Sequence, residues 1–286
     1  MGAPASATVI TAGVALGQEL NRNIQAIAEE AAGRISRGEA AELLELAEAV
    51  QEATGGAFSP FLGEIIGLWG INEPEREHGL PRVDEFFPAL ERSKSGLGQV
   101  DLDAVGMGYA LDRVNDYLES RRVQNALVSF GGSTLALGMN RGGNLWMVGI
   151  SDPLDPGRMA GVVQARDKFI SVAAAYERYV NIGGINYAHI IDPATGYPVS
   201  NDLVGVAVVM GAKSAATPRA RRERLEDNGA VADALARALL VMGRQGALDF
   251  YMRSELDFEM ILFYRSEDDP RGFEIVHTNV AFSGRD

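Results

Sequence analysis

The chain has 286 residues, of which 47% are hydrophobic, and this is enough apolar material for one large packed domain or two small ones. Its formal net charge of -13 and its pI near 4.8 argue against a nucleic-acid partner, because binding to a phosphate backbone requires clustered lysine and arginine. The absence of cysteine excludes disulfides, thiolate catalysis and zinc sites with cysteine ligands.

The sequence predicts no membrane-spanning segment. No run approaches the roughly 18 apolar residues of a transmembrane helix. The opening segment MGAPASATVITAGVALG is small and apolar but lacks the basic region of a secretory signal. We therefore expect a soluble protein, cytoplasmic as the sequence stands, or periplasmic if an export signal was removed from a longer precursor.

The first half of the chain is predicted to be mainly helical. Small and β-branched residues at the start predict a strand, and the positions Leu43, Leu46 and Val50 that follow are spaced as on one helix face. Prolines between Glu73 and Lys94 favour turns and short helices. The predicted elements are a strand at 1–16, a helical region at 18–53 closed by Gly55-Gly56, a short buried helix at 63–69, turns and short helices at 73–94, and a helix at 109–120.

The second half is predicted to be rich in β-sheet, because its apolar residues recur with a period close to two. A charged, weakly apolar segment, KSAATPRARRERLEDN at 213–228, is predicted to be an exposed insert. A helix starting near Val231 follows it. The predicted strands span residues 126–130, 145–150, 169–175, 204–210, 258–264 and 274–280.

The order of these elements predicts the fold class. Helices and antiparallel-looking strands in mixed order indicate an α+β fold rather than a regular βαβ winding. No fixed-period repeat and no low-complexity linker divides the chain. We therefore expect residues 1–286 to form a single domain that carries the charged insert at about 213–228.

The stretch HIIDPATGYPV, from His189 to Val199, is the most informative motif. It places an imidazole, a carboxylate and a hydroxyl in one turn-rich segment after an aromatic, strand-like run. Alone it is also compatible with an ordinary surface turn, since Asp-Pro and Thr-Gly are common turn signals. Four segments accompany it, namely ATGGAFSPFLGEIIGLWG at 53–70, VDLDAVGMGYALDRV at 100–114, ALVSFGGSTLALG at 126–138 and VADALARALLVMG at 231–243.

In their order and rough spacing these segments resemble the FAD:protein FMN transferases, the ApbE-type flavin transferases, over nearly the whole chain. The resemblance implies one α+β unit with two sheet-containing lobes and a flavin cleft between them. It also implies an activity, the transfer of FMN from FAD to a Thr or Ser hydroxyl of a partner protein, with AMP leaving. The expected partners are then FAD and a flavin-acceptor protein.

The resemblance implies roles for individual residues. His189 corresponds to a general base, and an imidazole has the basicity to take a proton from a hydroxyl. The alternative is a structural histidine that caps a turn. Met1 corresponds to a methionine that contacts the flavin, and the alternative is that it is only the start residue. The positions implied to bind FAD are Met1, Ala57, Phe58, Ser59, Asp101, Ala104, Met107, Gly131, Gly132, Ile190 and Arg237.

The resemblance also implies a magnesium ion at the diphosphate. Relatives hold it with a carboxylate and a hydroxyl of an A-D-A-L-A-T helix and with a main-chain carbonyl, and the positions that match these ligands are Asp233, Arg237 and Ala104. Asp233 and Ala104 are thus the implied metal ligands. Arginine cannot bind a metal, so magnesium is expected to bind weakly or not at all. Arg237 could pair with the Asp233 carboxylate, or bind the diphosphate directly from the place of the metal.

The chain departs from the polar pattern of the family at several places while it retains glycines, turn residues and core. If these places share one cleft, a loss of metal-dependent catalysis explains them jointly, whereas a compensating Arg237 preserves activity. Three functions stay open: an active transferase, a non-catalytic flavin- or adenine-nucleotide-binding protein, and a dinucleotide hydrolase. The departures are Ser59, Phe61, Met107, Ser133, Ala173-Ala174-Ala175 and Arg237.

Overall fold

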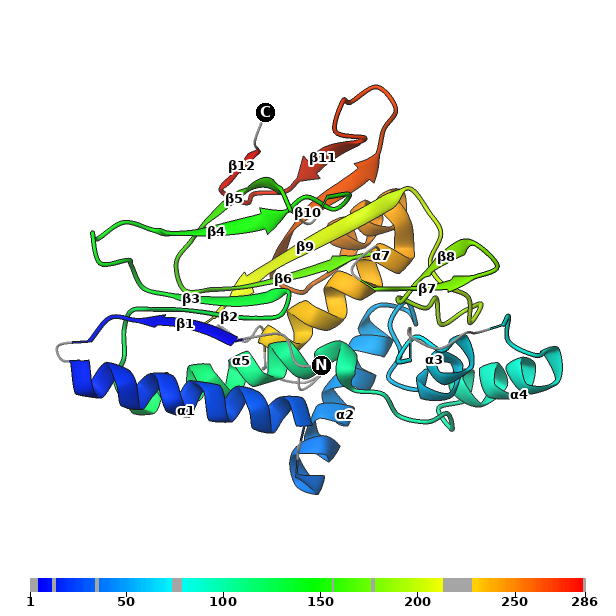
Figure 1. The fold of residues 1–286 in the computed structure, drawn as a ribbon, viewed down its shortest axis with the longest axis horizontal. Coiled ribbons are helices and arrows are strands. Elements are labelled where there is room, and N and C mark those ends of the chain that lie inside the picture. The colour runs from blue at the N-terminus through cyan, green and yellow to red at the C-terminus, as the bar shows by residue number, and fades with distance from the viewer. Residues whose placement is uncertain are drawn as a thin grey trace.

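The computed structural model describes residues 5–11, 14–33, 36–73, 79–155, 157–175, 178–212 and 228–284, and it confirms the predicted α+β class (Figure 1). Its helices are α1 (Val14–Gly33), α2 (Arg37–Ala53), α3 (Gly63–Trp69), α4 (Val83–Lys94), α5 (Asp103–Ser120) and α7 (Asn228–Arg253). Its strands are β1 (Ala5–Val9), β2 (Ala126–Phe130), β3 (Ser133–Leu137), β4 (Trp146–Ser151), β5 (Met159–Ala165), β6 (Lys168–Ala174), β7 (Tyr179–Ile182), β8 (Ile185–Ala188), β9 (Leu203–Gly211), β10 (Phe258–Arg265), β11 (Phe273–His277) and β12 (Phe282–Gly284).

A seven-stranded antiparallel sheet in the order β1-β2-β3-β6-β9-β10-β11 forms the centre of the molecule. The helices α1, α5 and α7 lie along one side of it, and the smaller sheet β12-β5-β4 lies on the other (Figure 1). Successive side chains of a strand point to opposite faces of a sheet. Accordingly Val206 and Val208 of β9 pack into the core shared with α5 and α7, whereas Ala207 and Val209 pack toward β4 and β5.

A second, smaller lobe is built from α3, α4 and the hairpin β7-β8, which lie together at the right of Figure 1. Its separate apolar core includes Ile65, Phe86 and Val180. Trp69 at its centre is 1% exposed, and its Nε1 donates a hydrogen bond to the carbonyl oxygen of Gly196 at 2.8 Å. The predicted short buried helix at 63–69 is therefore confirmed. The HIIDPATGYPV motif is anchored on this lobe.

The structure corrects the predictions for the N-terminal region. Strand β1 ends at Val9 and α1 starts at Val14, so residues 1–16 do not form one strand. The helical region at 18–53 consists of two helices, because Ser36 starts a new one. Its Oγ accepts from the amide of Glu39 at 3.3 Å, and the Glu39 carboxylate accepts from the amide of Ser36 at 3.2 Å. This capping box is a start signal that residues 36 and 39 carry in the sequence itself.

Several short strands were not predicted, and helix α5 begins earlier than predicted. The hairpin β7-β8 turns at Gly183-Gly184, both with positive φ, which is a recognisable hairpin signal. Strand β3 is buried along its whole length and therefore lacks the alternation used to find strands. Helix α5 starts at Asp103, whose amide donates to the Asp101 carboxylate at 2.9 Å. The unpredicted strands are β3, β5, β7 and β12, whereas β8 is the strand-like run noted before His189.

Three further predictions concern a membrane span, the charged insert and Met1. No helix in the described ranges is long and apolar enough to cross a membrane. The charged insert predicted at 213–228 lies outside the described residues except for Asn228, which begins α7. Met1 also lies outside them, so its predicted contact with flavin stays a prediction.

Candidate functional site

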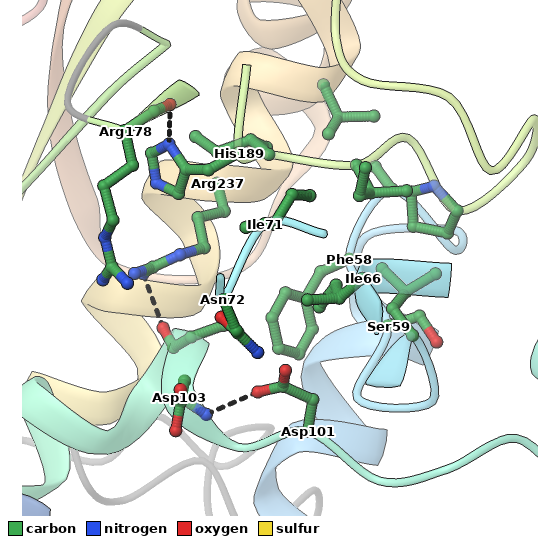
Figure 2. A pocket seen from close by; sticks show the side chains of 17 residues that line it. Phe58, Ser59, Ile66, Ile71, Asn72, Asp101, Asp103, Arg178, His189 and Arg237 are labelled. Atoms are coloured by element: carbon green, nitrogen blue, oxygen red, sulfur yellow. Dashed lines mark hydrogen bonds between the residues drawn. The ribbon is translucent and has the colours of Figure 1, made fainter. Parts of the chain in front are cut away.

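A pocket lies where α3, the start of α5, the HIIDPATGYPV motif and α7 meet, and its two sides differ in chemistry (Figure 2). Apolar side chains, among them Phe58 and Ile66, line one side. His189 and two arginines, Arg178 and Arg237, line the other. A pocket with this division suits a ligand that has a flat apolar ring at one end and an anionic group at the other.

The carboxylate and the hydroxyl of the motif hold the turn together. The Asp192 carboxylate accepts from the amide of Ala194 at 2.8 Å and from the hydroxyl of Thr195 at 3.0 Å. Gly196 has φ 72°, and its amide donates to the carbonyl oxygen of Asp192 at 2.7 Å. These side chains therefore shape the backbone, and His189 is left as the ionisable group of the motif that lines the pocket.

The hydrogen bonds of His189 determine which ring nitrogen is available for chemistry. Its Nδ1 lies 3.1 Å from the carbonyl oxygen of Arg178, which can only accept, so Nδ1 carries the proton. The free electron pair is then on Nε2. Burial, reinforced by the positive charges of Arg237 and Arg178, lowers the pKa of His189 to about 4. At neutral pH the imidazole is therefore neutral and able to accept a proton.

The protonation state of His189 can be measured directly. A lowered pKa means that the neutral form persists to lower pH, so the His189 ring signals in a nuclear magnetic resonance titration are expected to stay constant between about pH 5.5 and 8. Because the chain has only three histidines, the spectrum of His189→Asn assigns the signal. A His189 transition near the ordinary value of about 6.5 would contradict the geometry described above.

Asp233 of α7 is a buried carboxylate whose oxygens are occupied by hydrogen bonds. One oxygen accepts from the hydroxyls of Ser133 and Ser171, each at 2.5 Å. The other accepts from the amide of Gly108 at 2.6 Å. The residue is 2% exposed. The carboxylate therefore joins α5, β3, β6 and α7 where these elements meet, as buried charges must be hydrogen-bonded to be tolerated.

Arg237 lies one helical turn after Asp233, and it binds main-chain oxygens rather than the carboxylate. Its Nη1 donates to the carbonyl oxygen of Ala104 at 2.5 Å and to that of Asp233 at 3.1 Å. The possible pairing of Arg237 with the Asp233 side chain is therefore wrong. The reason is that donors from three other elements have already taken that carboxylate.

A model of the ApbE family matches residues 17–262. The chain belongs to this family. The FAD:protein FMN transferase of Treponema pallidum is 32% identical over 232 residues, which are 70% of this chain and 59% of the relative. The FAD:protein FMN transferase of Vibrio cholerae is 28% identical over 226 residues, 73% of this chain and 62% of the relative. The chain thus spans about three fifths of the length of these curated relatives.

Solved structures of the ApbE family share the fold. The flavin transferase ApbE from Vibrio cholerae aligns with a TM-score of 0.74 at 22% identity, over 96% of this chain and 98% of that one. The apo form of the flavinyl transferase ApbE from Pseudomonas stutzeri aligns with a TM-score of 0.75 at 21% identity, over 98% and 94%. The family resemblance expected from the five sequence segments is confirmed.

The magnesium ion implied by the resemblance to other ApbE proteins does not fit the residues present here. Magnesium requires oxygen ligands that are free to point at it. The Asp233 carboxylate is held by three protein donors, and a guanidinium nitrogen occupies the carbonyl oxygen of Ala104. The described residues contain no group of three or more His, Asp and Glu that could hold a metal. The positive charge beside the carbonyl oxygen of Ala104 is the guanidinium group of Arg237.

The structure brings most of the predicted FAD-binding positions together, but not all of them. The positions that line the pocket are Ala57, Phe58, Ser59, Asp101, Ala104, His189, Ile190 and Arg237. Met107, Gly131, Gly132 and Asp233 do not line it. Met107 instead packs against Gly131, where its sulfur fills the space that a Cβ atom would take. Ionisable or polar lining residues that the sequence analysis did not find are Asn72, Asp103 and Arg178.

The departures from the ApbE polar pattern do not share one cleft. Only Ser59 and Arg237 line the pocket. Ser133 is bonded to Asp233, Phe61 is buried, and Ala173 and Ala174 lie buried in β6. The structure therefore does not place all of these positions at this pocket, and a joint loss of metal-dependent catalysis stays a prediction. The changes at the pocket itself reduce to Ser59 and Arg237.

Proposed function

We propose that this protein transfers FMN from FAD to a Ser or Thr hydroxyl of a partner protein. The observation that carries the proposal is the neutral imidazole of His189, which lines the same pocket as the guanidinium of Arg237 and an apolar wall. A phosphoryl transfer needs a group that accepts the proton of the attacking hydroxyl and a positive charge beside the phosphates. Both are present in one pocket, and the relatives named FAD:protein FMN transferase support the choice of substrate.

His189 Nε2 takes the proton of the acceptor hydroxyl, whose oxygen forms a bond to the FMN phosphorus of FAD. The bond between that phosphorus and the bridging oxygen breaks, and AMP leaves with the oxygen. The products are a phosphoester between FMN and the acceptor protein, AMP, and a proton first held by His189. The guanidinium of Arg237 stabilises the negative charge of the phosphates during the transfer.

The test combines purified protein with FAD and an acceptor protein of a curated relative. Flavin fluorescence of the acceptor band in a denaturing gel reports attached FMN, and chromatography reports AMP. Transfer predicts equal amounts of AMP and protein-bound FMN. AMP with only free FMN would identify a hydrolase. FAD binding, seen as a change in flavin fluorescence, without AMP would identify a non-catalytic flavin-binding protein. The last two results each overturn the proposal.

A further inference from the structure

Arg237 has hydrogen-bonding capacity left after it has bound the protein. A guanidinium carries five N–H donors. In the described part of the chain only its Nη1 has protein partners, the carbonyl oxygens of Ala104 and Asp233. These two contacts orient the side chain at the pocket wall (Figure 2). Nε and Nη2 are thus held in place for a further acceptor.

Arg178 reaches the same pocket from the start of β7. Its carbonyl oxygen accepts the hydrogen bond of the His189 ring, and its side chain extends along the charged side of the pocket (Figure 2). Within the described ranges no ion pair joins Arg178 to a carboxylate. This guanidinium is therefore a second positive charge, placed beside the group that takes the proton.

The two guanidinium charges act on the same surroundings. Both contribute to the low pKa of His189, and both oppose the rise in the pKa of Asp101 that its burial causes. Asp101 accepts from the amide of Asp103, and no ion pair within 4.0 Å links Asp101 or Asp103 to either arginine among the described residues.

We infer that Arg178 and Arg237 form a two-guanidinium clamp that binds the diphosphate of FAD without a divalent cation. The inference rests on the proposed function, which supplies FAD as the substrate. Guanidinium groups match phosphate oxygens with paired, charge-assisted hydrogen bonds. The clamp leaves the apolar side of the pocket, with Phe58 and Ile66, for a ring system of the dinucleotide. Arg237 occupies the carbonyl oxygen that would otherwise bind a metal.

The first measurement tests the independence from metal. FAD is titrated into the full chain without acceptor protein, and binding is followed by flavin fluorescence in excess EDTA and again in excess magnesium chloride. The two dissociation constants are expected to agree within about two-fold, because fixed side chains already neutralise the phosphates. Binding that is roughly ten-fold or more tighter with magnesium would overturn the inference, since that gain is the contribution expected of a metal bridge.

The second measurement tests the two side chains. Arg178→Met and Arg237→Met are each expected to weaken FAD binding by about 10- to 100-fold, the usual contribution of hydrogen bonds to a charged group. Riboflavin, which lacks phosphate, serves as the second ligand, and its affinity is expected to change less than two-fold or so. The control is Arg253→Met, an exposed arginine at the end of the same helix α7.

The exposed position of Arg178 keeps the test independent of folding, even if Arg237→Met destabilises the contacts to Ala104 and Asp233. Unchanged FAD affinity in Arg178→Met, or equal losses for FAD and riboflavin, would overturn the clamp. Failure of the proposed function can be distinguished from failure of the clamp. A protein that binds FAD through these arginines but releases no AMP retains the clamp and is no transferase, whereas one that transfers FMN only with magnesium is a transferase without the clamp.

Discussion

Replacement of His189 by asparagine is expected to slow FMN transfer by roughly 10²- to 10⁴-fold while FAD affinity stays nearly unchanged. Asparagine can place its amide nitrogen near the position of Nδ1 and so retain the hydrogen bond to the carbonyl oxygen of Arg178. It has no group at the position of Nε2, so the proton acceptor alone is removed. Single-turnover measurement of AMP release, with FAD at saturation, reports the chemical step.

Two controls separate the proton acceptor from a structural histidine. The midpoint of urea unfolding should match that of the unmodified protein, because the bond to Arg178 persists. His189→Ala, which loses that bond as well, is expected to show the same loss of rate and additional destabilisation of about 1 kcal/mol. Normal AMP release by His189→Asn would assign His189 to the turn and remove it from the reaction.

Replacement of Asp233 by alanine is expected to lower the free energy of unfolding by about 3–5 kcal/mol, because it leaves buried donors without a partner. These donors are the hydroxyls of Ser133 and Ser171 and the amide of Gly108. They come from β3, β6 and α5, so their loss loosens the contact between the sheet and its helices. Urea unfolding of the flavin-free protein measures the effect.

Asp249→Ala provides the matched control, since Asp249 is a partly exposed aspartate on the same helix α7. Its expected effect is within about 0.5 kcal/mol. If Asp233→Ala unfolds like the unmodified protein but binds FAD only weakly, Asp233 is a ligand of the site and not the structural carboxylate inferred from its three donors. The experiment therefore distinguishes a role in folding from a role in metal or nucleotide binding.

The two roles of α7 explain how an ApbE fold persists with a changed site. Asp233 and Arg237 lie one turn apart on the same side of α7, but the short carboxylate is bonded to α5 and the sheet, whereas the longer guanidinium reaches the pocket. The hydrogen bonds of the Asp233 carboxylate therefore do not involve the Arg237 side chain. In the same way Met107, at the place where the resemblance implied a lysine, fills the space beside Gly131 and contributes packing rather than charge. The altered site thus reduces to a few positions on an intact scaffold.

Local signals in the sequence determined the α+β class, most helices and the HIIDPATGYPV turn. Helical spacing, glycine at helix ends and Asp-Pro or Thr-Gly turns depend on neighbouring residues, so they can be read without the fold. The order of five such segments also determined the family. The resemblance to that family implied that His189, Asp101, Ala104 and Arg237 share one site. Strand β3 was missed because burial on both faces removes the alternation.

Only the tertiary structure decided where the charges point. Arg178 entered the site because the β7-β8 hairpin, which pairs Tyr179 with Ala188, sets Arg178 opposite His189, and the fold places the end of this hairpin at the pocket. The Asp233 carboxylate turned to the interior because donors at residues 108, 133 and 171, distant in the sequence, meet there. Because these donors take the carboxylate, Arg237, four residues later, binds the main-chain oxygens of Ala104 and Asp233 instead. The direction of a buried charge depends on which donors the fold assembles around it, and that assembly is a property of the whole chain.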